Sequence, residues 1–330
     1  MKNIKKDLIH LINQKLNQNQ LPDLEWLESI LSTTKLDNSK ELKTLISCIK
    51  KFITKIQNPT FSNIRITKLG SNFEQAYNLL KKFFNSDVLD PKELYTERME
   101  LLGKYPDKFP LFMTARIISL PGEIVVNSEG FLNLVDCNKN RETNLLICVV
   151  SGNYIPLRGK FIGSGFGAIG HALTVKTFRN KGNATALMDY TIDLMTKFAE
   201  NRREKYLLTL LEAEKQSRTF WIKNGFRWPK DIEYFQPPLI FDENNGKPVF
   251  KEVKETLMIK YPKKSIKKDL LIEIITTLYR AWILSSYTDL PSEVFEKIQF
   301  YVMDYILKNF VEQKAMSGNE NILLTFPDIT

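Results

Sequence analysis

The stretch Val175–Tyr190, VKTFRNKGNATALMDY, joins a run typical of a β-strand to a pattern typical of a helix. The first N–H groups of a helix have no partner inside it, and they lie at the positive end of its dipole. Gly182 lets the backbone approach a bulky ligand closely, and Ala184 keeps the surface low. Arg179 and Lys181 add positive charge. The stretch therefore indicates either an ordinary strand-to-helix turn or an anion site best suited to a pyrophosphate.

The regions on both sides of this stretch alternate between strand and helix patterns from Ile64 to Tyr261. HALTV (residues 171–175) precedes the loop as a strand, and YLLTLLE (residues 206–212) follows the helix as another. The next segment, Gln216–Phe226, has the pattern of a short helix that ends at Gly225. KETLMIKYP (residues 254–262) is expected to be the final strand. These patterns predict a mixed α/β layer of about 200 residues.

Both ends of the chain have helical periodicity instead. Ser39 is a predicted N-cap, and Leu42, Leu45, Ile49 and Ile53 recur on one face of the helix that follows. After Pro262 two segments carry wide apolar stripes, which are more typical of packing faces than of ligand sites. We expect three parts: an N-terminal helical extension (residues 1–60), a central domain (residues 61–262) and a C-terminal helical extension (residues 263–330).

A second glycine-rich stretch, GFGAIG at Gly165–Gly170, satisfies the dinucleotide pattern GxGxxG. That pattern binds a dinucleotide only where it follows a strand and opens a helix. Here HALTV follows it, which has the pattern of a strand. We therefore expect a flexible approach loop and no dinucleotide site.

The bulk composition excludes several classes of protein. The net charge is +9 in 330 residues, which indicates either solvated lysine-rich faces or an anionic partner. No nucleic-acid motif is present, and no apolar run approaches the roughly 18 residues of a membrane span. Two histidines make a metal site improbable, and we expect none. The cysteines are scattered singly at Cys48, Cys137 and Cys148, which fits a reducing cytoplasm, and no secretory signal is recognised.

With these residues in place, the sequence resembles the GNAT superfamily, the GCN5-related N-acyltransferases. Arg179–Ala184 matches the signature R/Q-x-x-G-x-G/A, which binds the pyrophosphate of acyl-coenzyme A in that family. About 40 residues later, Glu214–Phe226 resembles the family's N-x-x-A-x-x-F-Y-x-x-x-G-F helix. Phe220 matches, as do Gly225 and Phe226, whereas Glu214, Ser217 and Trp221 replace the usual Asn, Ala and Tyr. The resemblance covers roughly residues 61–262.

The resemblance implies a fold and a donor site. The fold is α/β (α+β): a GNAT-like mixed, mostly antiparallel sheet flanked by helices, in which the strand at 171–175 splays from the strand at 206–212. The pantetheine arm of acyl-coenzyme A would lie against the exposed backbone of the first of these strands. The residues that the resemblance assigns to the co-substrate are Leu173, Thr174, Val175, Arg179, Asn180, Lys181, Gly182, Asn183, Ala184, Phe220 and Trp221.

The reaction implied is attack by a primary amine on a thioester. Such an amine is mostly protonated at neutral pH, so a general base would help. The candidates are Glu212, His171 and Glu214, and each could equally be a structural or solvated residue. Trp221 cannot replace the tyrosine that acts as general acid in many relatives. The thiolate leaves unaided or takes its proton from another group.

Acceptor and acyl group stay open at this stage. Acetyl is the family default, and a longer fatty acyl chain is an alternative, as in GNAT enzymes that tailor peptides. The acceptor is then a small molecule or a peptide lysine or ornithine side chain. The rival class is a non-catalytic GNAT-like module that binds coenzyme A or a partner protein. We expect no nucleic-acid partner, and the terminal helices could stabilise the domain or form a homodimer.

Overall fold

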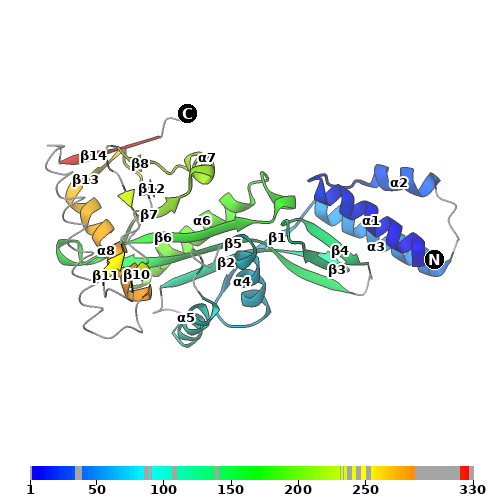
Figure 1. Cartoon of the computed structure of the whole chain (residues 1–330), viewed down its shortest axis with the longest axis horizontal. Coiled ribbons are helices and arrows are strands. Elements are labelled where there is room, and N and C mark those ends of the chain that lie inside the picture. The colour runs from blue at the N-terminus through cyan, green and yellow to red at the C-terminus, as the bar shows by residue number, and fades with distance from the viewer. Residues whose placement is uncertain are drawn as a thin grey trace. The chain divides into compact units, whose positions relative to one another are not determined.

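Figure 1 shows the computed structural model of the chain. Its residues fall into two compact units. One unit contains residues 1–151 and 171–191, and the other contains residues 152–170 and 192–330. The structure describes residues 2–33, 39–84, 89, 91–105, 110–137, 141–230, 232, 234–235, 240–242, 247–249, 254–286 and 320–326.

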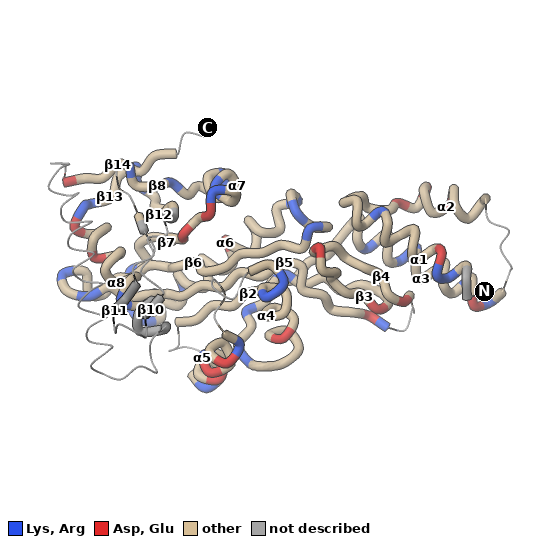
Figure 2. The backbone as a smooth tube through the Cα atoms, viewed as in Figure 1, with Lys and Arg blue, Asp and Glu red and all other residues tan. Residues whose placement is uncertain are grey.

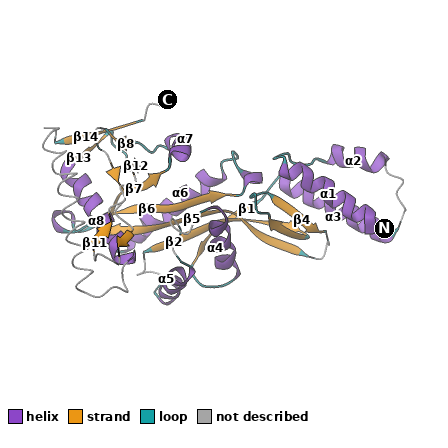
Figure 3. Ribbon diagram, in the orientation of Figure 1, coloured by secondary structure: helices purple, strands orange, loops and turns teal. Residues whose placement is uncertain are grey.

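Helices and strands alternate through the middle of the chain, as the periodicity predicts (Figure 3). The helices are α1 (Lys2–Asn17), α2 (Leu24–Thr33), α3 (Lys40–Gln57), α4 (Ser71–Phe83), α5 (Lys92–Lys104), α6 (Asn183–Asn201), α7 (Arg218–Lys223) and α8 (Lys268–Ser286). The strands are β1 (Phe61–Ile66), β2 (Leu111–Pro121), β3 (Glu123–Val126), β4 (Leu132–Asp136), β5 (Glu142–Pro156), β6 (Ser164–Thr174), β7 (Lys205–Ala213), β8 (Trp228–Pro229), β9 (Tyr234–Phe235), β10 (Ile240–Asp242), β11 (Lys247–Val249), β12 (Lys254–Lys260), β13 (Ser265–Lys267) and β14 (Asn321–Thr325).

The main sheet has the strand order β1-β2-β5-β6-β7-β12-β9. β1 pairs antiparallel with β2, and β12 pairs antiparallel with both β7 and β9, whereas β6 and β7 are parallel. A parallel pair needs a crossover connection, and α6 supplies it between β6 and β7. The predicted fold class, a mixed and mostly antiparallel sheet with flanking helices, is confirmed.

The N-terminal helices pack against the β3–β4 hairpin within the first unit. The predicted cap is present, because the Leu42 N–H donates to Ser39 Oγ at 3.3 Å. Asn13 of α1 binds the backbone of β4 twice: its Nδ2 donates to the Leu134 carbonyl at 2.9 Å, and its Oδ1 accepts from the Leu134 N–H at 2.8 Å. The amide side chain thus takes the place of a neighbouring strand at this edge.

A disulfide joins Cys48 of α3 to Cys137, which follows β4. The two Cα atoms lie 5.9 Å apart although 89 residues separate them in sequence. The expectation of three unpaired cysteines is therefore wrong, because packing of the N-terminal helices brings together residues that no local motif connects. Disulfides persist in oxidising surroundings, so the cytoplasmic prediction loses the support that it drew from the cysteines. Cys148 is a free, buried thiol.

The second unit has its own apolar core, formed by β7, β12 and α8 with residues from the smaller sheets. β13, β14 and β8 form a three-stranded sheet, so the strand at residues 254–260 is not the final one. The sequence pattern missed β13 and β14 because both are short. α8 confirms the first predicted C-terminal helix, whereas the second, at residues 291–310, lies outside the described residues. The three-part division into domains stays a prediction.

The glycine-rich stretch Gly165–Gly170 is part of β6, so the expected approach loop is wrong. A side chain at Gly165 would overlap the Tyr154 hydroxyl and lie 2.7 Å from the Ile155 carbonyl oxygen. A side chain at Gly167 would overlap the Tyr206 hydroxyl and lie 2.7 Å from Met195 Sδ. The rings of Tyr154 and Tyr206 stack with centroids 6.2 Å apart. These two glycines make room for two tyrosines, and the stretch opens no helix, which a dinucleotide fingerprint requires.

Candidate functional site

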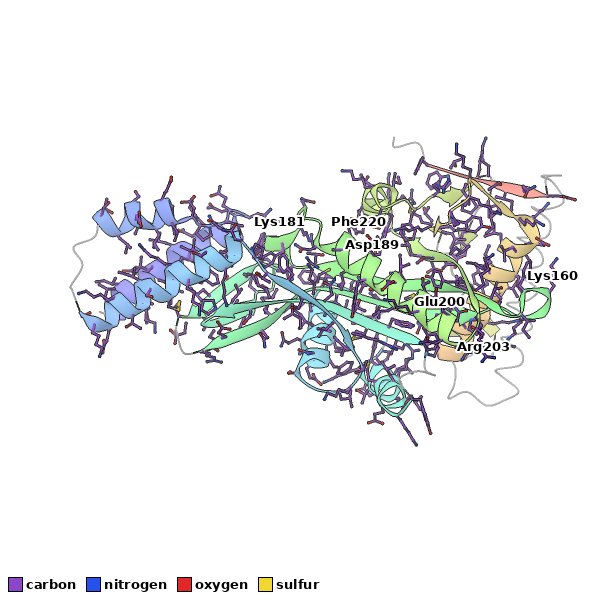
Figure 4. All side chains as sticks on the ribbon, turned by 180° about the vertical axis from the view of Figure 1, so that it is seen from behind. Lys160, Lys181, Asp189, Glu200, Arg203 and Phe220 are labelled. Carbon is purple, nitrogen blue, oxygen red and sulfur yellow. A yellow bond between two sulfur atoms is a disulfide. The ribbon has the colours of Figure 1, made fainter. Side chains whose placement is uncertain are left out.

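The loop between β6 and α6 is anchored at its start and exposed in its middle. The Val175 N–H donates to the Ile147 carbonyl of β5 at 2.8 Å, and a 3₁₀ turn follows at Lys176–Phe178. Phe178 is fully buried and meets the Phe61 ring edge-on at 5.8 Å. Residues 179–182 are exposed, and Figure 4 labels Lys181 among them. The signature residues are thus accessible to a ligand.

Two residues of this loop have left-handed backbone conformations. Asn180 has φ = 58° and Gly182 has φ = 73°. Asparagine tolerates this region better than most residues, and glycine adopts it without a steric cost. No atom lies within 4 Å of the position that a Cβ of Gly182 would occupy, so open space adjoins the backbone there. This open space fits the predicted close approach of a ligand.

The first turn of α6 presents backbone N–H groups next to that space. The Ala186 N–H donates to the Gly182 carbonyl at 3.0 Å, which is the first hydrogen bond of the helix. The amides of Asn183, Ala184 and Thr185 precede it, so they have no acceptor within the helix. α6 has 19 residues, and its dipole adds a positive potential at this end.

The cationic side chains of Arg179 and Lys181 donate hydrogen bonds to backbone carbonyls close to the loop. Arg179 Nε donates to the Thr174 carbonyl at 2.9 Å, and Lys181 Nζ donates to the Thr177 carbonyl at 3.2 Å. Desolvation lowers the pKa of Lys181 from its ordinary value. Lys176 Nζ lies 5.1 Å from the centroid of the Phe131 ring. Basic residues therefore gather on the segment that leads into α6 (Figure 2).

The end of β6 provides the backbone next to this loop. Leu173, Thr174 and Val175 are buried, and Thr174 Oγ1 contacts Cys148 Sγ at 3.1 Å. Burial raises the pKa of the Cys148 thiol to about 11, so this thiol stays protonated at neutral pH. The ladder between β6 and β7 ends at the pair Ile169 and Leu211, although β6 continues to Thr174 and β7 to Ala213.

His171 lies in a buried cluster of the first unit. Its Nδ1 is 3.1 Å from Ser151 Oγ and 3.4 Å from the Tyr95 hydroxyl, and its ring meets that of Phe84 with centroids 4.9 Å apart. If both hydroxyls donate to Nδ1, the neutral ring carries its hydrogen on Nε2 and cannot accept a proton there. If Nδ1 donates to Ser151, Nε2 holds the lone pair that a base needs. The tautomer therefore decides whether His171 can act as a base.

The other predicted catalytic residues belong to the second unit. Glu212, near the end of β7, accepts a hydrogen bond from the hydroxyl of Tyr234. Tyr234 is buried, and desolvation raises its pKa well above the ordinary value. A hydrogen bond to a carboxylate favours its charged form and lowers its basicity. Glu214 is exposed, and its carboxylate accepts from Gln216 Nε2 at 2.5 Å. It opens the turn before α7, as an ordinary helix-start residue does.

The two aromatic residues of the second sequence block lie on α7. Trp221 is buried against Phe220 and Phe226, with ring centroids 4.8 and 5.4 Å apart, and its Nε1 donates to Ser217 Oγ at 3.1 Å. Gly225 has φ = 83° and follows the last turn, which confirms the predicted helix end. Figure 4 labels Phe220 on this helix. The indole of Trp221 therefore packs in a small aromatic cluster with Phe220 and Phe226, and it carries no acidic hydroxyl.

The structure brings together the residues of the loop, the end of β6 and His171 in the first unit. It places Glu212, Glu214, Phe220 and Trp221 in the second unit. Sequence reasoning missed Arg116, which binds the loop through Asn183, and Tyr234, which binds Glu212. Within the described residues, no group of three His, Cys, Asp or Glu side chains has the geometry of a metal site. No helix there combines the length and the apolar character that a membrane span requires.

Comparison with known proteins finds similarity in structure alone. No family model and no curated protein matches the chain. NAA60 of Arabidopsis thaliana in complex with acetyl-CoA has a TM-score of 0.38 and 11% identity, covering 62% of this chain and 99% of that chain. A GNAT-family acetyltransferase from Desulfovibrio desulfuricans has a TM-score of 0.37 and 8% identity, covering 61% and 97%. Arabidopsis thaliana glucosamine-6-phosphate N-acetyltransferase has a TM-score of 0.31 and 15% identity, covering 50% and 90%.

Identities this low do not extend to activity, and a function for this chain has to rest on its own residues.

Proposed function

We propose that this chain is a GNAT-type N-acyltransferase that moves an acyl group from acyl-coenzyme A to a primary amine. The observation that carries the proposal is the loop Arg179–Ala184. Its sequence matches a diphosphate-binding signature, its residues 179–182 are exposed, and it leads directly into the N-terminus of α6. Open space adjoins the Gly182 backbone, and two cations, Arg179 and Lys181, lie in the same loop.

The residues present fit the diphosphate of coenzyme A. Backbone amides at a helix N-terminus bind phosphate oxygens, and a positive backbone dipole favours the negative charge. Arg179 uses Nε to bind the Thr174 carbonyl, and its remaining guanidinium N–H groups are suited to phosphate oxygens. The same carbonyl belongs to β6, whose backbone would receive the pantetheine arm. Loop and strand thus form one continuous donor site in the proposal.

The proposed reaction is a direct transfer. The neutral amine attacks the thioester carbonyl, so a C–N bond forms and the C–S bond breaks. The amine loses one proton to a base, and the departing thiolate takes up one proton to become a thiol. A backbone N–H of β6 would donate to the carbonyl oxygen as negative charge develops on it.

The base of the proposal is His171, provided that its Nδ1 donates to Ser151. Glu212 is the second candidate, and its carboxylate accepts a hydrogen bond from the Tyr234 hydroxyl. Glu214 is exposed at a helix start, so we assign it no chemical role. The indole of Trp221 cannot protonate the thiolate, so this proton would come from solvent or from the acceptor. The acyl group would be acetyl or a longer fatty acyl chain, and the acceptor a small amine or a peptide side chain.

The deciding experiment is a calorimetric titration with acetyl-, decanoyl- and palmitoyl-coenzyme A, followed by thiol-release assays with a panel of amines. Binding together with amine-dependent thiol release supports the transferase, and the preferred chain length identifies the donor. Binding without transfer to any amine supports the non-catalytic module instead. Absence of binding to all three donors contradicts both.

A matched pair of variants tests the base. His171→Gln removes the imidazole, whereas Ser151→Ala removes only the hydroxyl that orients it. If His171 is the base, both variants lower kcat and leave donor affinity unchanged, and the larger loss belongs to His171→Gln. Unchanged kcat in His171→Gln, with loss in Glu212→Gln, would transfer the role to Glu212.

A further inference from the structure

Arg116 lies on β2, outside the loop and outside every sequence motif, yet it contacts the loop directly. Its guanidinium stacks on the Phe61 ring at 4.5 Å from the centroid. Its Nη1 donates to Asn63 Oδ1 at 2.7 Å, and its Nε donates to Asn183 Oδ1 at 2.9 Å. The side chain is partly buried, and desolvation lowers its pKa, although arginine stays charged at any ordinary pH.

Asn183 is fixed by this contact in one orientation. The Asn183 side chain is 2% exposed, and its Nδ2 donates to the Phe178 carbonyl at 2.9 Å. Arginine has no acceptor, so the amide oxygen has to face Arg116 and the amide nitrogen has to face Phe178. The hydrogen bond from Nδ2 links the two residues that flank the exposed loop 179–182.

The contacts around the loop close a ring. Phe178 packs on Phe61, Phe61 stacks under Arg116, Arg116 binds Asn183, and Asn183 binds Phe178. The loop inside this ring contains the two left-handed residues, Asn180 and Gly182. Glycine adopts this conformation freely, whereas a residue other than glycine, such as Asn180, adopts it less often and keeps it where its surroundings determine it. An exposed loop makes few contacts that could fix its own backbone, so we infer that the closed series of contacts from Phe178 through Phe61, Arg116 and Asn183 fixes it.

We propose that Arg116 is a positioning residue for the diphosphate of the acyl donor: acting through Asn183, it sets the direction of the backbone amides at residues 180–184. The inference rests on the proposed function and adds to it a residue that no signature contains. It commits to the diphosphate as the group whose binding depends on Arg116, because the amides in question belong to the loop and to the first turn of α6. Binding of the pantetheine arm along β6 does not depend on it.

The test compares Arg116→Gln with Arg65→Gln. Arg65 is the matched control: it lies on β1 of the same two-stranded ladder and also stacks on an aromatic ring, Phe112, at 4.4 Å. It donates to the Leu111 carbonyl, and it belongs to no part of the loop. Affinity for coenzyme A is measured by calorimetry, and affinity for pantetheine, which lacks the diphosphate, by ligand-detected NMR. Both are measured at a temperature at which circular dichroism shows every variant folded.

We expect Arg116→Gln to weaken coenzyme A binding roughly tenfold, or about 1.4 kcal/mol, and to leave pantetheine binding unchanged. Arg65→Gln should change neither. Asn183→Ala should reproduce the loss, and the double variant Arg116→Gln/Asn183→Ala should be no weaker than the single ones, because both remove one interaction. Arg116→Lys should restore little, because an ammonium cannot reproduce the planar fork.

Several outcomes overturn the inference. Coenzyme A affinity of Arg116→Gln within twofold of the unmodified protein would do so, as would equal losses for coenzyme A and pantetheine. Additive losses in the double variant would show that Arg116 does not act through Asn183. Hydrogen exchange without ligand separates this inference from the proposed function: the amides of residues 178–186 should exchange faster in Arg116→Gln than in Arg65→Gln. If the unmodified protein binds no coenzyme A, the proposed function fails. Equal hydrogen exchange in Arg116→Gln and Arg65→Gln would by itself refute the positioning role of Arg116.

Discussion

The loop Arg179–Gly182 and the strand segment Gly165–Gly170 both attract attention in the sequence through their glycines, and they differ in almost every physical respect. The loop is exposed, its glycine has φ = 73°, and nothing lies near the missing side chain. The strand segment is mostly buried, and Gly165 and Gly167 face the hydroxyls of Tyr154 and Tyr206. In the loop, glycine allows a left-handed backbone with open space beside it, whereas in the strand it leaves packing space for neighbouring side chains. Only the arrangement in the loop suggests a ligand.

The largest expected effect is on binding at the loop. Gly182→Glu should weaken coenzyme A binding roughly 100-fold, about 2.7 kcal/mol, because a carboxylate would occupy the space that the proposal assigns to the diphosphate. Gly182→Asn is the matched control, because asparagine tolerates a left-handed conformation and adds no charge. It should lose far less affinity. Calorimetric titration of both variants checks this. Equal affinity of Gly182→Glu and the unmodified protein would remove the distinction between the two segments.

The next effect is on stability, and it belongs to the strand. Gly165→Val should lower the free energy of unfolding by about 2 kcal/mol, because the new side chain collides with Tyr154 and with the Ile155 carbonyl. Donor affinity of the folded protein should change little. Urea unfolding followed by circular dichroism measures the loss. A stable Gly165→Val variant that fails to bind coenzyme A would show instead that the strand glycines serve a ligand.

The elements on either side of both segments were predictable from the sequence, because hydrophobic periodicity and caps are local signals. The strand HALTV, the helix at Asn183 and the stop at Gly225 are all confirmed. The functions of the glycines were not equally accessible. Gly182 lies in a local sequence signature that predicts diphosphate binding. Gly167 is explained by Tyr206, which is distant in sequence.

The side-chain contacts of the candidate residues could not be predicted for the same reason, because the partners are distant in sequence. Arg116 and Asn183 are 67 residues apart, and Glu212 and Tyr234 are 22 apart. Neither pair forms a repeat, a motif or a spacing that chemistry dictates. Such contacts become visible only when strand order and register are known, since pairing β1 with β2 sets Asn63 opposite Arg116.

A coupling of smaller size would sharpen the packing explanation. Gly167→Ala should destabilise the protein, and part of the loss, about 1 kcal/mol, should disappear in the Tyr206→Phe background, because the Tyr206 hydroxyl is the first atom that the new methyl meets. A double-mutant cycle on unfolding free energies measures this. Strictly additive losses would mean that Gly167 is present for another reason.

The smallest effect is a pH dependence of stability, and it has opposite signs for Tyr206, the β7 neighbour of Gly167, and for Lys181 of the loop. Burial raises the pKa of Tyr206 to about 12, whereas burial lowers the pKa of Lys181 in the loop. An unfolded tyrosine titrates near pH 10. The contribution of Tyr206 to the free energy of unfolding is therefore present below about pH 10 and is lost as the pH rises toward 12. Unfolding measured at pH 9, 10 and 11 should show this decline, and Tyr206→Phe should show less of it. An identical decline in both proteins would refute the assignment.

The disulfide between Cys48 and Cys137 has a mechanical consequence. A chain stretched from its two termini bears tension along its backbone, but the S–S bond carries that tension past the segment between the two cysteines, which are 89 positions apart in the sequence. At about 3.4 Å per residue, roughly 300 Å of contour length stays hidden until a reductant cuts the bond. An optical-tweezers trace taken before and after addition of dithiothreitol would show that hidden length as a single added extension.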